Sequence, residues 1–461
     1  MMVIGLFSVV PFTAGAEAID TAEISFDVNG GSGTMNPVTV AIGSSYTLPE
    51  CSLTPKTGEM FYHWSINGNT YVPGESITVS GNTTVKAEWG STSVWDYTTV
   101  YIGSDMTISK QIEIVNTVTL KIAEGKTLTV PKGIHVPKGS NFVIQGNGNL
   151  KINKVASEQA GIGGNNGEFF GSVTIQGGNV TVTGGSSGAG IGCGSCPGTD
   201  SKLGRISING GNVRATGGFS GAGIGGGLSG CCKSIIISSG TVTAIGGEYG
   251  AGIGSGEAIF ANGLTSGQIN INGNADVTAT GGKYAAGIGG GRLASCDKIT
   301  LSGGTVKATG GNYGPGIGGG NISTGGTIKI GHSNITAVGG MHGAGIGGGE
   351  NGNVDTIEIR SGNVTAKGGS KGAGIGSGSD KGFNSIEIWG GAVTAQAVRK
   401  LRILAAVIMA ILEISIYMAV IPPQRTIQSE HINMMKTSEY QFFLGGAEVP
   451  TVFIRRNTVA L

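Results

Sequence analysis

The sequence predicts an all-β fold dominated by a right-handed parallel β-helix with coils of about 29 residues. Three observations lead to this fold class: a glycine-rich cassette recurs at a nearly fixed interval, apolar residues alternate within each cassette, and glycines separate the alternating runs. A regular period of this length is typical of proteins built from stacked repeats. Each coil then contacts only its neighbours, so the repeats form one extended surface.

The cassette, whose core reads A-G-I-G in most copies, occupies residues 158–396. Successive core isoleucines lie 29, 33, 29, 35, 29, 29 and 29 residues apart, so the unit is 29 residues long with insertions of four and six. The core isoleucines are Ile162, Ile191, Ile224, Ile253, Ile288, Ile317, Ile346 and Ile375.

Apolar residues recur 11, 13, 18 and 20 positions after each core isoleucine, as in Ile235, Ile237, Val242 and Ala244. Pairs that lie two residues apart are typical of strands with one face turned inward. Together with the Ala-x-Ile pair of the core they predict three short strands per coil, stacked about 4.8 Å apart. Collagen is excluded because the glycines have no three-residue period, and a disordered linker because the strand residues are regularly phased.

Composition excludes some classes of function. The net charge is +1 and no basic run is interleaved with aromatic residues, which gives no basis for nucleic-acid binding. Residues 1–18 are apolar and contain A-x-A sites, so we interpret them as a secretory signal peptide that lacks a basic start. Buried thiols, a disulfide of Cys196 with Cys231 or Cys232, and a metal site at Cys193 and Cys196 are the alternatives for the cysteines.

Residues 22–90 differ from the cassettes: alternating runs separated by Asn-Gly, Pro-Gly and Gly-Asn turns predict a small β-rich module. The segment contains F-D-V-N-G-G from Phe26, W-S-I-N-G from Trp64, P-G-E-S-I-T-V from Pro73 and V-K-A-E-W ending at Trp89. This pattern resembles the internalin-B-type B repeat, also called the Listeria–Bacteroides repeat. The resemblance implies a β-grasp-like, non-catalytic module of bacterial surface proteins.

Residues 98–157 contain short strands at irregular spacing, such as Ile112–Ile114 and Phe142–Ile144, and are expected to form capping coils of the solenoid. A cap is needed because a bare first coil exposes an edge that can pair with other strands. The cassette itself resembles the G-A-G-I-G-G-G repeats of secreted Gram-positive proteins, which are described as carbohydrate-binding or adhesin-like.

Acidic residues are scattered, as expected of a chain without a catalytic centre. Asp200, Asp276 and Asp380 fall in insertions or turns, whereas Glu358 and Glu387 share an outward strand position that Lys329 occupies one coil earlier. This order predicts a solvated ladder of charges. We expect no catalytic residues, no metal site and no cofactor.

Aromatic residues form a row. Four positions before the core isoleucine stand Tyr249, Tyr284, Tyr313 and His342, in four successive coils, and Phe219 lies one place earlier in the preceding coil. Two interpretations follow. The rings are exposed and bind a ligand such as a polysaccharide, or they form an aromatic ladder that stabilises the stacking of coils.

The repeat stops after Gln396, and residues 397–461 look aberrant. Residues 401–421 are apolar enough to span a bilayer. However, the basic flank of Arg399 and Lys400 orients the span against the signal peptide, and Glu413 lies in its middle. Codons can be chosen for residues 400–423 such that translation from the third base of the Lys400 codon gives the repeat cassette again. Its core isoleucine then falls level with Leu404, 29 residues after Ile375. We therefore expect an out-of-frame tail, and no membrane span in the in-frame part.

Three functional hypotheses result. The first is a non-catalytic secreted or cell-surface protein that binds a polysaccharide, or another host or cell-wall ligand, along a repetitive face. The second is a glycan-degrading β-helix lyase or hydrolase, which needs a cluster of acids on one face. The third is a purely structural stalk.

The frame of the tail is directly testable. Resequencing of the gene across codons 395–425 is expected to reveal an altered base count that restores the cassette. An intact frame that encodes the printed residues contradicts this prediction.

Overall fold

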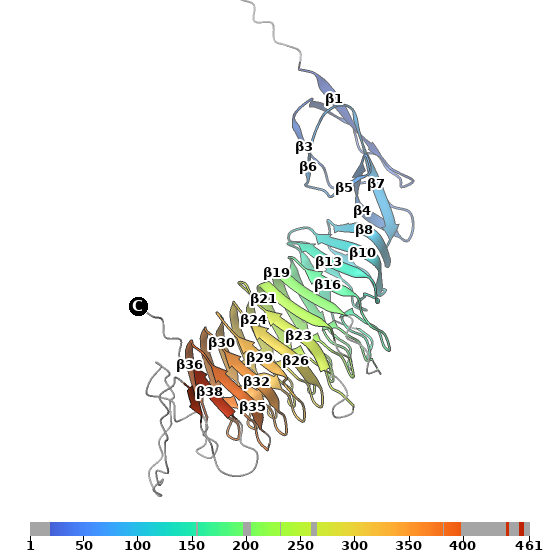
Figure 1. Cartoon of the computed structure of the whole chain (residues 1–461). Coiled ribbons are helices and arrows are strands. Elements are labelled where there is room, and N and C mark those ends of the chain that lie inside the picture. Colours follow the sequence, from blue (N-terminus) through green and yellow to red (C-terminus); the bar gives the residue numbers. More distant parts are fainter. Residues whose placement is uncertain are drawn as a thin grey trace, which may run out of the picture. The chain divides into compact units, whose positions relative to one another are not determined.

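The computed structural model describes residues 19–153, 155–196, 204–230, 232–259, 265–380, 382–397, 439–441 and 451–455. These residues form strands, turns and loops without a helix, and the chain divides into two compact units, Met1–Gly90 and Ser91–Leu461 (Figure 1). No helix in the described part of the chain is long and apolar enough to cross a membrane. The expected signal peptide and the apolar stretch at 401–421 lie outside the described residues.

The first unit is a mixed β-sheet with a small hairpin. Trp64, Ile24 and Val85 are completely buried in its core. The sheet has the order β2-β1-β7-β4-β5, in which β1 and β7 are parallel and the β1–β2 and β4–β5 pairs are antiparallel. The strands are β1 (Thr21–Asp27), β2 (Val38–Ala41), β4 (Glu59–Ile66), β5 (Asn69–Tyr71) and β7 (Thr83–Ser91), with β3 (Ser45–Thr47) and β6 (Ser76–Thr78) as a separate antiparallel pair.

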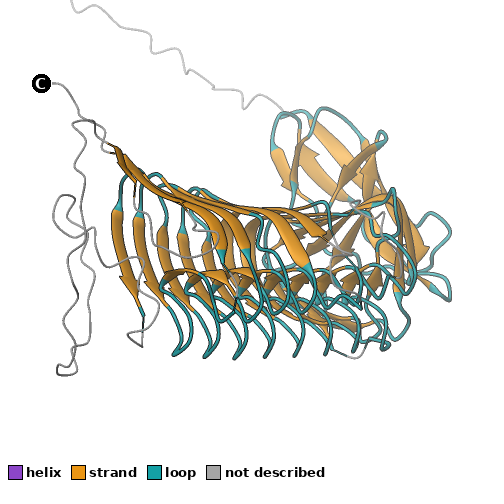
Figure 2. Ribbon diagram, turned by 60° about the horizontal axis from the view of Figure 1, so that its bottom comes forward, coloured by secondary structure: helices purple, strands orange, loops and turns teal. Residues whose placement is uncertain are grey.

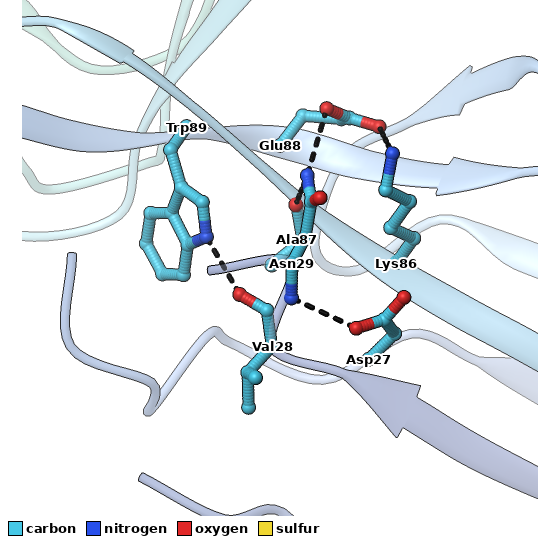
Figure 3. Close-up of polar contacts among 7 residues, drawn as sticks. All are labelled: Asp27, Val28, Asn29, Lys86, Ala87, Glu88 and Trp89. Carbon is cyan, nitrogen blue, oxygen red and sulfur yellow. Dashed lines mark hydrogen bonds and ion pairs between the residues drawn. The ribbon is translucent and has the colours of Figure 1, made fainter. Parts of the chain in front are cut away.

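The F-D-V-N-G-G motif is held against the end of β7 (Figure 3). Asn29 Nδ2 donates to the carbonyl oxygen of Ala87 (2.8 Å) and to Glu88 Oε2 (3.2 Å), and Trp89 Nε1 donates to the carbonyl oxygen of Val28 (2.8 Å). A Cβ atom at Gly31 would lie only 2.7 Å from Trp89 Cζ2, which explains the glycine there. The contacts between the F-D-V-N-G-G and V-K-A-E-W motifs therefore join the two ends of the module.

The second unit is a parallel β-helix. Of the described strands, 31 are connected into one sheet in which nearly all coil-to-coil pairs are parallel, and Figure 2 shows the strands of successive coils lying side by side in rows. The first coils are formed by β8 (Val94–Ile102), β9 (Met106–Thr107), β10 (Ile112–Ile122), β11 (Thr127–Thr129), β12 (Ile134–His135), β13 (Asn141–Gly146) and β14 (Asn149–Ile152).

Each later coil contributes up to three strands. The first row, which contains the core isoleucines, is β15 (Ile162–Gly163), β18 (Ile191–Gly192), β20 (Ile224–Gly225), β22 (Ile253–Gly254), β25 (Ile288–Gly289), β28 (Ile317–Gly319), β31 (Ile346–Gly348) and β34 (Ile375–Gly376). The second row is β16 (Ser172–Ile175), β23 (Thr265–Ile271), β26 (Ser295–Leu301), β29 (Thr327–Ile330), β32 (Val354–Ile359) and β35 (Phe383–Ile388). The third row is β17 (Asn179–Thr183), β24 (Asp276–Thr280), β27 (Thr305–Thr309), β30 (Asn334–Val338), β33 (Asn363–Lys367) and β36 (Ala392–Gln396), and in two coils β19 (Arg205–Thr216) and β21 (Ser234–Ile245) continue through both rows.

The predicted phasing is confirmed. The core isoleucines from Ile162 to Ile346 are 0% exposed and Ile375 is 6% exposed. Ile235, Ile237, Val242 and Ala244, which represent the four alternating positions, are all 0% exposed. The all-β fold class with a right-handed parallel β-helix is therefore as expected from the sequence.

Glycine is required directly after the core isoleucine. At this position φ lies between 131° and 144° in every coil from Gly163 to Gly376, a range that residues other than glycine rarely adopt. From Gly163 to Gly347, a Cβ atom would also overlap the carbonyl oxygen of the equivalent glycine in the next coil. The recurring glycine thus allows neighbouring coils to approach each other at this position.

Two described strands belong to the tail. β38 (Thr451–Arg455) pairs in parallel with β35, and β37 (Glu439–Gln441) pairs with β38 in antiparallel orientation. The register places Val452 beside Ile386 and Ile454 beside Ile388. The predicted change of frame is not tested by this arrangement and stays a prediction.

Ile317→Asp tests the inward phasing. An unpaired carboxylate among apolar residues is expected to cost several kcal/mol and to unfold the adjacent coils, lowering the melting temperature. Thr336→Asp, at an outward and exposed position of the same coil, is the matched control and should change stability little. Equal melting temperatures of Ile317→Asp and the unmodified protein would refute the phasing.

Candidate functional site

The aromatic row forms a continuous ladder of rings, here called the ring ladder: Phe219, Tyr249, Tyr284, Tyr313 and His342. The ring centroids of successive members lie 4.8, 5.2, 4.8 and 5.0 Å apart. Tyr284 and Tyr313 are nearly parallel at 9°, whereas Phe219 meets Tyr249 edge-on at 80°. The face of Tyr284 that meets Tyr313 is therefore covered by that ring, and offset ring pairs of this kind stabilise stacking by about 0.5–1.5 kcal/mol each.

Exposure changes along the ladder. Phe219 is 49% exposed, Tyr249, Tyr284 and Tyr313 are half-buried, and His342 is only 7% exposed. The hypothesis that all four predicted ligand-binding residues lie in solvent therefore fails at His342. Its Nδ1 lies 2.9 Å from Glu350 Oε1 and 3.2 Å from Ser379 Oγ, and these contacts hold the ring beneath the surface.

A further set of residues, here called the flanking set, runs beside the rings: Arg292, Asn321 and Glu350. In the coils of Ile288, Ile317 and Ile346, the residue four positions after the core isoleucine donates its backbone N–H to the carbonyl of the ring residue one coil earlier. Arg292 bonds in this way to Tyr249 (2.8 Å), Asn321 to Tyr284 (2.9 Å) and Glu350 to Tyr313 (2.8 Å). Sequence reasoning missed the flanking set, although its fixed distance from the core isoleucine was a usable signal.

Two side chains of this flanking set, Arg292 and Glu350, contact the rings. The guanidinium carbon of Arg292 lies 5.2 Å from the Tyr249 centroid and 5.9 Å from that of Tyr284, within the range of cation–π attraction. Arg292 Nη1 also pairs with Glu257 Oε1 at 2.8 Å. A hydrogen bond to Tyr284 raises the pKa of Lys283, whose Nζ lies 5.1 Å from the Tyr284 centroid.

Exposed apolar side chains flank the ring ladder. Apart from Val94 (46%) at the start of β8, the large exposed apolar residues of the described coils are Phe219 (49%), Ile259 (56%), Ile322 (41%) and Met341 (43%). Phe219 and Met341 immediately precede the ring position of their coils, and Ile322 immediately follows Asn321 of the flanking set. Ile322 also has φ of 53°, which is strained for a β-branched residue. This corner therefore combines rings, apolar groups and both signs of charge.

The predicted ladder of charges exists in register, but its central member, Glu358, is buried and not solvated. β29 places Lys329 beside Glu358, and β35 places Glu387 on the other side. Glu358 is only 5% exposed, because Lys329 Nζ (2.8 Å from Oε2) and Arg360 Nε both contact its carboxylate. Burial by itself raises the pKa of Glu358, but hydrogen bonds from Lys329 and Arg360 outweigh it and lower the pKa below the usual value.

The cysteines lie inside the coils. Cys193, Cys196 and Cys232 are each 2% exposed or less, and Cys231 lies outside the described residues, so the alternatives of thiol and disulfide stay open. Cys296 is a buried thiol whose Sγ lies 3.6 Å from the carbonyl oxygen of Gly267, and burial raises its pKa to about 12. Among the described residues no group of three His, Cys, Asp or Glu side chains could hold a metal ion.

Comparison with protein families agrees with this architecture. A family model described as a beta helix repeat matches six segments of the stacked coils: residues 173–195, 206–228, 235–257, 269–292, 299–321 and 357–379. The six matched segments are therefore β-helix repeats, in agreement with the parallel coils of the second unit. Comparisons with curated proteins and with solved structures gave no match.

Glu358→Gln tests the buried carboxylate. Because the folded-state pKa is lowered, the charged form stabilises the fold above the unfolded pKa, and this contribution is lost as the pH falls through the folded pKa. The substitution is expected to cost about 2 kcal/mol at pH 7. It should also flatten the decline in stability between about pH 5 and pH 3, measured by denaturant unfolding. Glu387→Gln, at the equivalent place one coil later, is the control, and an equal loss from both variants would contradict the assignment.

Proposed function

We propose that this chain is a non-catalytic secreted or cell-surface protein that adheres to a polysaccharide along the corner occupied by the ring ladder. The observation that carries the proposal is the gathering of aromatic, exposed apolar and paired charged groups at one corner, over four to five coils. Rings and planar hydrogen-bonding groups are the surfaces that bind sugars by stacking and by contacts to hydroxyls.

The geometry limits how a glycan would contact the ladder. Because Tyr284 and Tyr313 stack on each other, a sugar reaches their edges and not the faces between them. Phe219, the most exposed ring, is at the end of the ladder and is the one available for face-to-face stacking. Arg292 and Lys283 donate hydrogen bonds, and the side chain of Arg292 is 37% exposed although it is paired with Glu257. A chain lying along the corner would thus meet several modest contacts in succession.

A secreted or surface location is part of the same proposal. It is supported by the apolar character of residues 1–18 and by the resemblance of residues 22–90 to the internalin-B-type B repeat. In that module Trp64 is 0% exposed, and Trp89 is half-buried with its indole nitrogen bonded to Val28, so both support the module's own core. The ligand is therefore sought on the coils.

A glycan-degrading enzyme is the less favoured alternative. Catalysis of this kind uses two carboxyl groups, one of which has a raised pKa so that it can donate a proton. Glu358 has a lowered pKa and is held by two cations, which makes it a poor proton donor. A purely structural stalk is the stronger competitor, since the ring-to-ring contacts would stabilise the coils without any ligand.

A glycan array probed with the full chain tests the proposal, followed by titration of any glycan that binds. Simultaneous Tyr249→Ala, Tyr284→Ala and Tyr313→Ala substitution is expected to weaken binding at least a hundredfold, because each aromatic contact contributes roughly 1–3 kcal/mol in comparable stacked complexes. Circular dichroism should remain that of a β-helix. The matched control replaces Thr278, Thr336 and Thr365 with alanine, three exposed residues of the third row in different coils.

Two further variants separate binding from stability. Phe219→Ala removes the exposed terminal ring and should lower affinity while the melting temperature stays nearly unchanged. Replacement of the three tyrosines by phenylalanine keeps the ladder but removes its hydroxyl groups. If the triple alanine variant loses its fold and no glycan binds the unmodified chain, the stalk is the correct account.

A further inference from the structure

The outer edge of β2 has a defined set of free backbone groups. Among the described strands β2 pairs only with β1 and is the outermost strand of its sheet. The N–H of Ile42 donates to the carbonyl oxygen of Asp20 (2.8 Å), and this bond establishes which residues of β2 direct their backbone groups toward β1. Val38 and Val40 therefore direct their backbone groups toward β1, and Thr39 and Ala41 direct theirs away.

The opposite strand agrees with this assignment. Glu23 lies opposite Thr39, and its N–H turns away from β2 to Asn82 Oδ1 (2.9 Å). The outward carbonyl of Ala41 already accepts hydrogen bonds from the backbone N–H of Ser44 (3.2 Å) and from Ser44 Oγ (2.6 Å). Within the described part of the chain, the outward groups of Thr39 and the N–H of Ala41 are thus available for another strand.

Apolar surface accompanies these groups. Val38 and Val40 lie opposite Ile24 and Ala22, two buried core residues, and therefore belong to the core face of the sheet. Nevertheless Val38 is 38% exposed, and Ile42, which continues the same alternation, is 45% exposed. Residues 36–42, N-P-V-T-V-A-I, also contain no charged side chain, although charged residues commonly protect exposed sheet edges.

We propose that two copies of the chain associate through antiparallel pairing of their β2 strands about a two-fold axis at Thr39. The N–H of Thr39 donates to the carbonyl oxygen of Thr39 of the partner subunit, and the reverse bond forms by symmetry. The N–H of Ala41 then donates to the carbonyl oxygen of Pro37 of the partner subunit. In this register Pro37 lies opposite Ala41 of the partner subunit. Pro37 has no N–H to donate, and the carbonyl of Ala41 needs no further donor because it is already bonded to Ser44, so the pair is self-complementary.

The side chains fit the same register. With Thr39 on the axis, Val38 lies opposite Val40 of the partner subunit, in the type of pair where side chains approach most closely. The partly exposed apolar strip at the edge of one sheet would thereby continue into the other and lose contact with water. β2 contains no charged residue, so no like charges meet across this seam. The occupant of this edge is thus a second copy of the strand itself.

Sedimentation equilibrium of the full chain provides the first test, with a concentration-dependent doubling of the mass as the expected result. Thr39→Pro removes the central donor but none of the bonds between β2 and β1, since the N–H of Thr39 points away from β1. This variant should sediment as a monomer with an unchanged melting temperature, whereas Thr39→Ser should dimerise normally. A monomeric unmodified chain at every concentration, or a Thr39→Pro variant that dimerises normally, would overturn the proposal.

A crosslinking test remains decisive if Thr39→Pro fails to fold. Opposed Cα atoms in a hydrogen-bonded antiparallel pair are about 5.5 Å apart, within the range of roughly 4.4–6.8 Å that a disulfide spans. Thr39→Cys is therefore expected to give a covalent dimer on mild oxidation, visible on a non-reducing gel. Glu23→Cys, which lies opposite Thr39 but one strand further from the seam, is the control and should remain monomeric on the gel. Equal crosslinking of both variants, or of neither, contradicts the proposed register.

Discussion

Stacking of the coils in register is the constraint on which the rest of the β-helix depends. Each strand of the first row pairs with its equivalent one coil later, so that Ile317 lies beside Ile346 and Gly318 beside Gly347. The glycine after each isoleucine makes this approach possible, because its φ and the carbonyl of the next coil leave no space for a side chain. A residue placed in one coil consequently meets the residue of the same position in the next coil.

The ring ladder is a direct consequence of that constraint. Tyrosines at one position of successive coils come to lie about 5 Å apart, so that Tyr249 meets Tyr284 at a tilt and Tyr284 stacks on Tyr313. The same register places Arg292 and Glu350 beside rings of the preceding coil through backbone hydrogen bonds. A single feature thus stabilises the coils and gathers binding groups at one corner, which is why stability and binding must be measured separately.

Much of the fold could be predicted from the sequence, because the period and the pairs of apolar residues determine which side chains point inward. The surface was less predictable. The ligand-binding interpretation of the rings required His342 in solvent, but the sequence did not show that Glu350, eight residues later, would contact its ring. Glu358 was expected to be solvated, yet Arg360, which directly follows the strand of Glu358, covers it together with Lys329. Such contacts depend on side-chain orientation around corners, and the apolar period contains no information about it.

The modular account is tested most directly by removing one whole coil. Deletion of residues 318–346 joins Ile317 to Gly347 and removes 29 residues, so every remaining position stays in phase. The account predicts a chain with the circular dichroism of a β-helix and a melting temperature close to that of the full protein. Deletion of residues 318–331, about half a coil, should instead misalign the strands and unfold the neighbouring coils. Equal stability of the two deletion variants, or unfolding of both, would contradict the account.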